Sequence, residues 1–196
     1  YWLPESVVKE STNVLSLGVH RDVGWEQSML ADNPNMNMHL YDPTPDSVRL
    51  FETNFPGKDR MTFHQLAYAG ENGKMKFYFD KNDLMKCYSL LPLPQFGEDP
   101  GYIEVDTKNL QTIMADDMPQ PDIIKADIEG SEVNLLKDAT FFENHNPKIL
   151  LEPISLKGKN SLEEIYSYMD HYGYEVKTYN QEGAKVPIYL FERNLK

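Results

Sequence analysis

The stretch DIIKADIEGSE, residues 122–132, decides the fold of this chain. Its apolar residues Ile123, Ile124 and Ala126 predict a buried strand, and Ser131 begins the apolar spacing of a helix. A buried strand that leads directly into a helix is the repeating unit of α/β folds. Because the carboxyl ends of the strands in an open α/β sheet border the ligand crevice, we expect a ligand site directly after this strand.

Several carboxylates occupy that strand end. Glu132 suits the first turn of the helix, where it complements the helix dipole, and Glu129 suits either that role or the site. Asp127 closes the strand and is the first candidate for a general base or a metal ligand, because an unpaired buried charge is costly. Glu152 closes the next strand, directly before Pro153. Asp127 and Glu152 could hold a divalent ion in oxygen ligands, or they could divide as general base and hydrogen-bond acceptor.

Length and composition indicate an ordinary globular domain. The 196 residues, of which 40% are hydrophobic and 26% charged, are most simply one domain. The single cysteine, Cys87, excludes an intramolecular disulfide framework and a multi-cysteine zinc site. No apolar run approaches the roughly 20 residues of a membrane span, and the N-terminus does not resemble a signal peptide. We therefore expect a cytoplasmic protein.

The charge balance bears on the partner. The formal net charge of −12 disfavours nucleic acid, whose non-specific affinity comes from lysine and arginine on phosphates. A small molecule or a glycan fits such a surface better. The chain begins at Tyr1 rather than at a methionine, which leaves open that it is a piece of a longer protein with another domain attached, such as a glycosyltransferase.

Strand-like and helix-like stretches alternate along the chain. This alternation predicts an α/β fold with a mostly parallel sheet, helices on both faces and a C-terminal antiparallel hairpin. The predicted strands are residues 14–19, 38–42, 61–69, 74–80, 122–127, 148–154, 174–180 and 186–192. The predicted helices are residues 25–31, 45–54, the segment through about 142, and 161–173. Residues 81–101 have no regular pattern and are a candidate lid or substrate loop.

The first two strands end in residues that suit a nucleotide cofactor. Gly18 lets the backbone approach a ligand, although an ordinary strand-to-helix turn explains it equally well. Asp42 follows Gly18 by 24 residues, near the ~20 expected for an acid that binds ribose hydroxyls. Taken alone, Asp42 could simply cap the next helix. The third strand places Leu66 and Tyr68 where a base could lie, although Tyr68 is better explained as a core residue.

Other familiar signatures of chemistry are absent from the sequence. The dinucleotide fingerprint G-x-G-x-x-G, the serine elbow G-x-S-x-G, a Walker G-K-[ST] and H-E-x-x-H do not occur. His64, in a strand that reaches the site edge, and His20, in the first loop, are candidate bases, although a lone histidine is more often structural. No metal ligand set is predicted beyond the alternative that pairs Asp127 with Glu152.

Together, LSLG at 15–18, YDPTP at 41–45 and DIIKADIEGSE at 122–132 resemble the FkbM family of S-adenosylmethionine-dependent methyltransferases. The last stretch is similar to the family hallmark, a hydrophobic pair, Lys, then I-D-[IV]-E-G-x-E. ILLEP at 149–153 resembles the next strand of the family, and the similarity covers about residues 14–173. The resemblance implies a Rossmann-like class I methyltransferase fold, S-adenosylmethionine as methyl donor, and O-methylation.

The first loop departs from the usual D-x-G-x-x-x-G of such enzymes, because Ser16, Gly18 and Asp22 stand in its place. It resembles a branch of the family in which the aspartate and a downstream acid such as Glu26 face the cofactor. The predicted cofactor-binding residues are therefore Ser16, Gly18, Asp22, Asp42 and Leu66. The predicted catalytic residues are Asp127, Glu129 and His64.

The reaction implied is methyl transfer to a hydroxyl, whose proton a base must take. We favour a sugar or glycan acceptor because Tyr88, Phe96 and Tyr102, in or next to the irregular segment, suit stacking on a pyranose. One alternative is an NAD(P)-linked sugar-modifying oxidoreductase, although G-x-G-x-x-G and Y-x-x-x-K are missing. Another is a catalytically silent methyltransferase-like domain, which the retained carboxylates disfavour.

Overall fold

The larger sheet of the protein is mostly parallel. The computed structural model describes residues 3–82, 87–153, 162–179 and 188–193. Pairing is parallel from β9 to β3, and β10 and β11 add an antiparallel edge. In order across the sheet, the seven strands are β10 (Glu175–Tyr179), β11 (Ile188–Glu192), β9 (Lys148–Leu151), β8 (Ile123–Ala126), β1 (Asn13–Leu17), β2 (Asn37–Tyr41) and β3 (Met61–His64).

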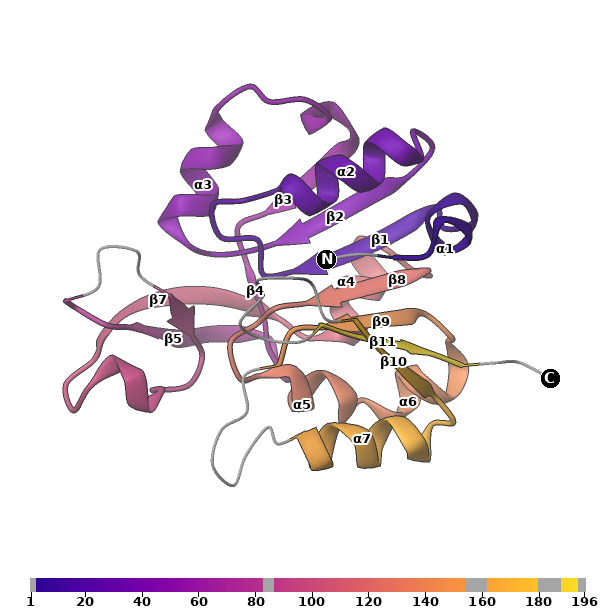
Figure 1. The fold of residues 1–196 in the computed structure, drawn as a ribbon. Helices are drawn as coiled ribbons and strands as arrows, with labels where there is room; N and C mark the ends of the chain where they lie inside the picture. The colour runs from indigo at the N-terminus through magenta and orange to yellow at the C-terminus, as the bar shows by residue number, and fades with distance from the viewer. Residues whose placement is uncertain (1–2, 83–86, 154–161, 180–187, 194–196) are drawn as a thin grey trace.

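A second, smaller sheet lies beyond the carboxyl ends of these strands. Its four strands, in order, are β4 (Ala67–Tyr68), β7 (Gly101–Lys108), β5 (Gly73–Phe79) and β6 (Tyr88–Ser89). The long antiparallel pair β5 and β7 extends away from the larger sheet, on the side to which the arrowheads of β1 and β2 point (Figure 1). The smaller sheet therefore stands next to the edge where ligand sites of α/β folds lie.

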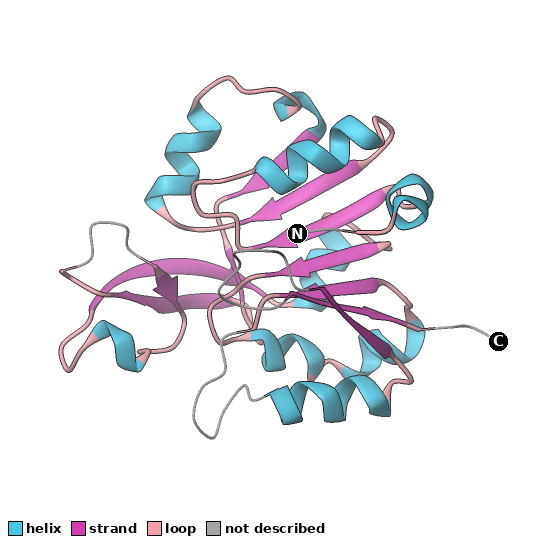
Figure 2. Ribbon diagram, in the orientation of Figure 1, coloured by secondary structure: helices cyan, strands magenta, loops and turns pink. Residues whose placement is uncertain are grey.

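Helices cover both faces of the larger sheet (Figure 2). The helices form two groups, one on each face of the sheet, and each group packs with its own cluster of buried hydrophobic residues. The first group is α4 (Leu110–Asp116), α5 (Glu132–Leu136), α6 (Ala139–Asn144) and α7 (Leu162–His171). The second group is α1 (Glu5–Glu10), α2 (Gly24–Asp32) and α3 (Pro45–Glu52). Two short 3-10 turns are η1 (Lys58–Arg60) and η2 (Pro94–Phe96).

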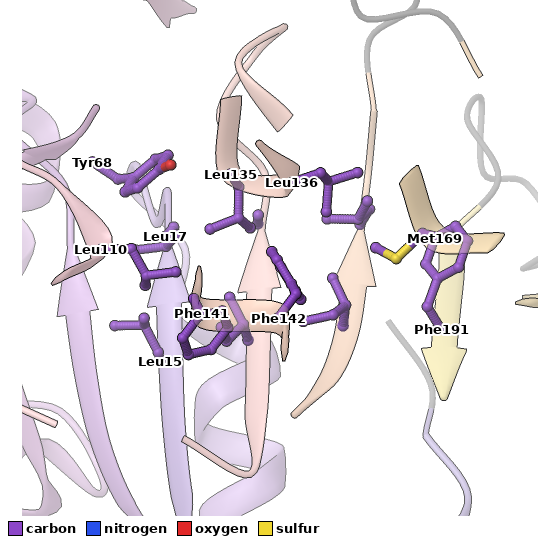
Figure 3. Packing of buried hydrophobic residues seen from close by; sticks show 14 of the residues in the cluster. Leu15, Leu17, Tyr68, Leu110, Leu135, Leu136, Phe141, Phe142, Met169 and Phe191 are labelled. Carbon is purple, nitrogen blue, oxygen red and sulfur yellow. The ribbon is translucent and has the colours of Figure 1, made fainter. Parts of the chain in front are cut away.

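The two clusters arise because successive side chains of a strand point to opposite faces. Leu15 of β1 and Ile124 of β8 belong to the cluster beneath α4 to α7, where Phe142 of α6 packs on the strands (Figure 3). Val14 and Ile123 belong to the cluster beneath α1 to α3. All of these side chains are fully buried. A strand buried on both faces reads as a continuous apolar run, which is the pattern that predicted it.

The structure confirms the predicted fold class and the antiparallel pairing of the two C-terminal strands. The turn predicted at residues 181–184 and the start of the helix predicted at 161 lie outside the described residues. Among the helices of the described residues, none is long and apolar enough to cross a membrane.

The structure corrects the sequence prediction at several boundaries. Residues 61–69 were predicted as one strand, but the amide of Leu66 donates to the carbonyl of His64 at 2.8 Å, and the chain turns from the larger sheet into the smaller one. The helix predicted through residue 142 is broken, because the side chain of Asp138 accepts from the amide of Phe141 and caps a new helix. The sequence prediction also missed α1, α4 and β7.

Candidate active site

The candidate active site lies where the strand order of the larger sheet reverses. Strand β1 pairs with β2 on one side and with β8 on the other, which is the switch point where open α/β sheets bind ligands. A cavity of about 410 Å³ opens there, within the usual range for small-molecule sites. Its wall is formed by Gly18, Val19, His20, Arg21, Tyr41, Asp42, Pro43, Thr44, Ala67, Tyr68, Phe77, Cys87, Tyr88, Leu90, Asp127, Ile128 and Glu129.

The loops after β1 and β8 touch at residue 18, and only glycine fits there. Its φ is +83°, and a Cβ at this position would lie 1.9 Å from the carbonyl oxygen of Asp127. That distance is far inside van der Waals contact, and the atom it would meet is backbone, which cannot rotate away. The two loops are therefore packed backbone to backbone at the floor of the cavity.

Asp42, at the end of β2, organises the first loop. Its Oδ2 accepts from the amides of Val19 at 2.9 Å and His20 at 2.7 Å. Its Oδ1 accepts from the amide of Thr44 at 2.7 Å and the hydroxyl of Ser47 at 2.8 Å. These four donors use the acceptor capacity of a carboxylate. Asp42 lines the cavity as predicted, but in this structure it holds its own loop, and its ribose-binding role stays a prediction.

A buried ionic network lies beneath that loop. The hydroxyl of Ser16 donates to Glu26 Oε1 at 2.7 Å, and Lys125 Nζ lies 3.8 Å from the same oxygen. Lys125 also donates to the carbonyl of Gly18 at 2.8 Å. Ser16, Glu26 and Lys125 are all nearly inaccessible to solvent. Ser16 and Glu26 therefore point into the protein interior, where the strand alternation directs Ser16 toward α2, and the predicted roles of Ser16 in binding the cofactor and of Glu26 in facing it stay predictions.

Two other predicted cofactor residues also lie off the cavity wall. Asp22 Oδ1 accepts from the amide of Gly24 at 2.7 Å and shapes the turn into α2. Leu66 packs against the core cluster beneath α4 to α7, whereas its neighbours Ala67 and Tyr68 line the cavity. The reason is the turn at Leu66, which directs the next two residues, rather than Leu66, toward the site.

Glu129 is the most perturbed acid of the cavity. Its backbone has a φ of +53°, which is unusual for a residue other than glycine. Burial raises the pKa of Glu129 to about 7, the charges of Asp127 and Glu152 add to this, and a hydrogen bond with Cys87 opposes it. Among the described residues, its buried Oε2 has no hydrogen-bond partner. A strained backbone and an unsatisfied carboxyl oxygen at a cavity wall are typical of a functional group.

Asp127 lines the cavity directly after β8, and its amide donates to the carbonyl of Leu17 at 3.0 Å. Glu152 does not line the cavity, although its charge acts on Glu129. Among the described residues, neither Asp127 nor Glu152 belongs to a group of three or more potential metal ligands. A metal held by Asp127 and Glu152 therefore gains no support.

His64 does not reach the cavity. Its ring stacks on that of Tyr41, with centroids 4.3 Å apart, and it is Tyr41 that lines the wall. His64 hydrogen-bonds to His39 at 3.0 Å and lies 3.9 Å from Asp117. The predicted role of His64 as a catalytic base stays a prediction, and it gains no support here because the ring of Tyr41 separates His64 from the cavity. Burial lowers the pKa of His64, and of His39 in the same way.

The opposite wall of the cavity comes from the smaller sheet and the segment predicted as a lid. Phe77 of β5 and Tyr88 of β6 stack with centroids 5.8 Å apart, and both line the cavity with Leu90. Of the other aromatics predicted to contact a sugar, Phe96 is buried and Tyr102 projects from β7 with 51% of its surface exposed. Only Tyr88 of the three is therefore placed at the site.

Sequence reasoning missed one residue that supports the site from beneath and two that line its wall. Lys125 lies inside the apolar strand β8, which is buried on both faces. A lysine in such a strand needs a buried partner of opposite charge, and this was the signal of the ion pair. Phe77 and Cys87 carried no such signal, because only the pairing of the smaller sheet brings them to the cavity.

The fold and the site define a class of protein. A parallel sheet with a C-terminal antiparallel hairpin, a glycine after β1 and acids after β2 and β8 are the arrangement of Rossmann-like class I methyltransferases. A sequence profile described as "Methyltransferase FkbM domain" matches residues 3–176. The chain therefore belongs to the FkbM family of methyltransferases, whose methyl donor is S-adenosylmethionine.

Solved structures of low identity share the fold. The fibrillarin pre-rRNA processing protein of Methanococcus jannaschii matches with a TM-score of 0.53 and 14% identity over 96% of this chain and 69% of that one. Aeropyrum pernix fibrillarin with natively bound S-adenosyl-L-methionine matches with a TM-score of 0.51 and 16% identity over 94% and 67%. An O-methyltransferase family protein from Burkholderia thailandensis matches with a TM-score of 0.51 and 11% identity. The match covers 95% of this chain and 52% of that protein. A comparison with curated proteins gave no significant match.

The cavity fits S-adenosylmethionine in two respects. Gly18, which lines the cavity and leaves no room for a side chain beside the carbonyl of Asp127, brings the backbone of the first loop to the cavity floor. The acids at the wall, Asp42, Asp127 and Glu129, suit a cationic donor. The residues that would hold the donor are those of the loops after β1, β2 and β8.

Proposed function

We propose that this chain transfers a methyl group from S-adenosylmethionine to a hydroxyl of a small-molecule or glycan acceptor, with Glu129 as the general base. The observation that carries the proposal is the buried Oε2 of Glu129, which lacks a hydrogen-bond partner among the described residues and belongs to a cavity wall. A base works best when its pKa lies near the working pH, and burial raises the pKa of Glu129 to about 7.

The roles of the cavity residues follow from their chemistry. When bound, the cofactor supplies a methyl group on a cationic sulfur, and methyl transfer to an oxygen mainly requires alignment of the two. Glu129 accepts the proton of the acceptor hydroxyl as the oxygen–carbon bond forms, and releases that proton to water afterwards. Asp127 contributes a negative charge that favours a cationic donor and adds to the raised pKa of Glu129, so that the ionised form of Glu129 is a stronger base. The sequence favoured Asp127 over Glu129 as the general base, and this proposal reverses that order.

The acceptor class rests on the aromatic wall. Tyr88 and Phe77 present ring surface at the cavity, and Leu90 and Ile128 add apolar contact. Aromatic rings beside a few convergent carboxylates suit a sugar, which has an apolar face and a rim of hydroxyls. The family assignment removes the support for an NAD(P)-linked oxidoreductase. That the chain is one domain, that it is joined to a glycosyltransferase-like domain, and that it is cytoplasmic stay predictions from the sequence.

Replacement of Glu129 by glutamine is expected to separate chemistry from donor binding. Glu129→Gln keeps the shape of the side chain but cannot take a proton, so turnover should fall about 10²- to 10⁴-fold. Turnover is measured with labelled S-adenosylmethionine and a panel of p-nitrophenyl glycosides of hexoses, deoxyhexoses and pentoses. The wild-type rate should rise with pH through the pKa of about 7 of Glu129, and the variant should lose that rise.

The control is Glu143→Gln, at an exposed glutamate of α6, which should leave turnover unchanged. Calorimetry with S-adenosylhomocysteine should give the same affinity for Glu129→Gln and wild type, and NAD⁺ should not bind. Unchanged turnover in Glu129→Gln would exclude it as the base and return the role to Asp127, with Asp127→Asn as the next variant. Donor binding without turnover on any hydroxyl compound would favour the catalytically silent alternative.

The same substitution should stabilise the protein at neutral pH. Between pH about 4.5 and 7 an unfolded chain ionises Glu129 while the folded protein still holds the proton, so folding stability falls as pH rises through this window. Glu129→Gln removes this loss. Its free energy of unfolding relative to wild type should increase by at most about 1.4 kcal/mol per pH unit and level off above pH 7. Urea denaturation at pH 5, 6, 7 and 8 measures it, and a constant difference would contradict the raised pKa.

A further inference from the structure

A cluster of two histidines and an aspartate lies outside the cavity, at the edge of the larger sheet. His39 comes from β2, His64 ends β3, and Asp117 directly follows α4. In the parallel register Tyr41 pairs with His64 and His39 with Thr62, so the two histidines are diagonal neighbours on one face. All three side chains are partly buried, in a position where the rest of this face carries apolar residues. The proposed methyl transfer uses none of these three residues.

The donor atoms of these three residues converge. His39 Nδ1 and His64 Nε2 lie 3.0 Å apart. Two Zn–N bonds of about 2.0–2.1 Å at a tetrahedral angle separate their nitrogens by roughly 3.3 Å, so the imidazoles are already near the spacing that a zinc ion requires. One ring nitrogen of each histidine and a carboxylate oxygen of Asp117 all lie within 4.8 Å of one another.

The surroundings of Asp117 leave one oxygen for such an ion. Its Oδ2 accepts from Lys108 Nζ at 2.9 Å and from the hydroxyl of Tyr41, whereas Oδ1 lies 3.9 Å from His64 Nδ1. This nitrogen is not the Nε2 that faces His39, so binding of one ion by all three residues requires the ring of His64 or the carboxylate of Asp117 to turn. Ligating carboxylates are commonly held by hydrogen bonds of this kind. Lys108 also donates to the carboxylate of Asp116 at 3.1 Å. Its positive charge is therefore balanced by Asp116 and does not repel a metal cation from the cluster.

We propose that His39, His64 and Asp117 bind a divalent transition-metal ion, zinc in the first place, that ties β2, β3 and the end of α4 together behind the cavity wall. Two imidazoles and one carboxylate are a donor set that suits zinc, and partial exposure leaves room for a water as fourth ligand. The ring of Tyr41 lies between this site and the cavity and stacks on His64, and the hydroxyl of Tyr41 donates a hydrogen bond to Asp117. A bound ion would therefore fix the Tyr41 part of the wall.

The test is metal binding by untagged protein, independent of any methyl transfer. Protein stripped with a chelator is titrated with zinc chloride by calorimetry, and we expect one equivalent to bind. Loading with Co²⁺ should give the visible absorption of a four- or five-coordinate ion with nitrogen ligands, which needs no variant. His39→Gln and His64→Gln should each weaken zinc binding about 10- to 100-fold or more, because each removes a ligand. The control His171→Gln, at an exposed histidine that ends α7, should bind as wild type.

Each other result would overturn the site. No saturable zinc or cobalt binding would leave His39 and His64 as a plain hydrogen-bonded pair. Undiminished binding in both variants, with circular dichroism confirming that they fold, would place the ion elsewhere, for example on the acids of the cavity. A cobalt spectrum typical of six oxygen ligands would also place the ion away from the two histidines, and this result needs no variant. Because the readout is the metal itself, failure here leaves the proposed methyl transfer untouched.

Discussion

Gly18→Ala is expected to destabilise the protein and to abolish binding of S-adenosylhomocysteine. The new methyl group would lie 1.9 Å from the carbonyl oxygen of Asp127, at a φ of +83° that disfavours any side chain. Relief requires the loops after β1 and β8 to separate, which opens the cavity floor. The positive φ and the overpacking together predict a loss of about 2–5 kcal/mol in the free energy of unfolding. Urea denaturation and calorimetry with S-adenosylhomocysteine measure the two effects.

Gly70→Ala is the matched control. Gly70 is exposed, and a Cβ there would meet nothing within 4 Å. Its stability should therefore stay within about 0.5 kcal/mol of wild type, with unchanged affinity for S-adenosylhomocysteine. If Gly18→Ala were as stable as Gly70→Ala and still bound the compound, the backbone contact between Gly18 and Asp127 would not be a requirement of the fold.

Lys125→Met is expected to cost about 3–5 kcal/mol, the usual consequence of removing one partner of a buried ion pair. Lys125 and Glu26 are 4% and 1% exposed, and Lys125 also donates to the carbonyl of Gly18. Methionine fills the space of the lysine stem, so the loss comes from the charge and the hydrogen bonds rather than from a cavity. The variant should also loosen the first loop, and its affinity for S-adenosylhomocysteine should fall. Chemical denaturation and calorimetry provide the measurements.

A double-substitution cycle tests the cause. Lys125→Met combined with Glu26→Gln should cost clearly less than the sum of the two single changes, because the second change removes the charge that the first left unpaired. Lys74→Met, which breaks the exposed pair with Asp106, is the control and should change stability little. Additive costs in the cycle would mean that Lys125 and Glu26 act separately, and that packing rather than charge pairing explains the loss.

Much of the fold was predictable because its signals are local. The strand at 122–127 and the helix after it were expected from an apolar run followed by helical spacing, and β8 and α5 lie within those residues. The hairpin of β10 and β11 was expected for the same reason. The strand predicted at 74–80 is β5, but its pairing with β7 in a separate sheet was not expected, because β7 lacks the apolar run of a buried strand.

The sequence by itself determined which strand ends carry the site. Gly18, Asp42, Asp127 and Glu129 all line the cavity, because the carboxyl ends of neighbouring parallel strands converge whatever connects them. Only the tertiary structure decided which nearby polar residues turn away from it. Ser16 and Glu26 face Lys125, and His64 faces His39 and Asp117. These choices depend on partners far apart in the chain, since 107 residues separate Lys125 from the Gly18 carbonyl it binds. A buried charge is stable only beside such a partner, and local spacing carries no record of it.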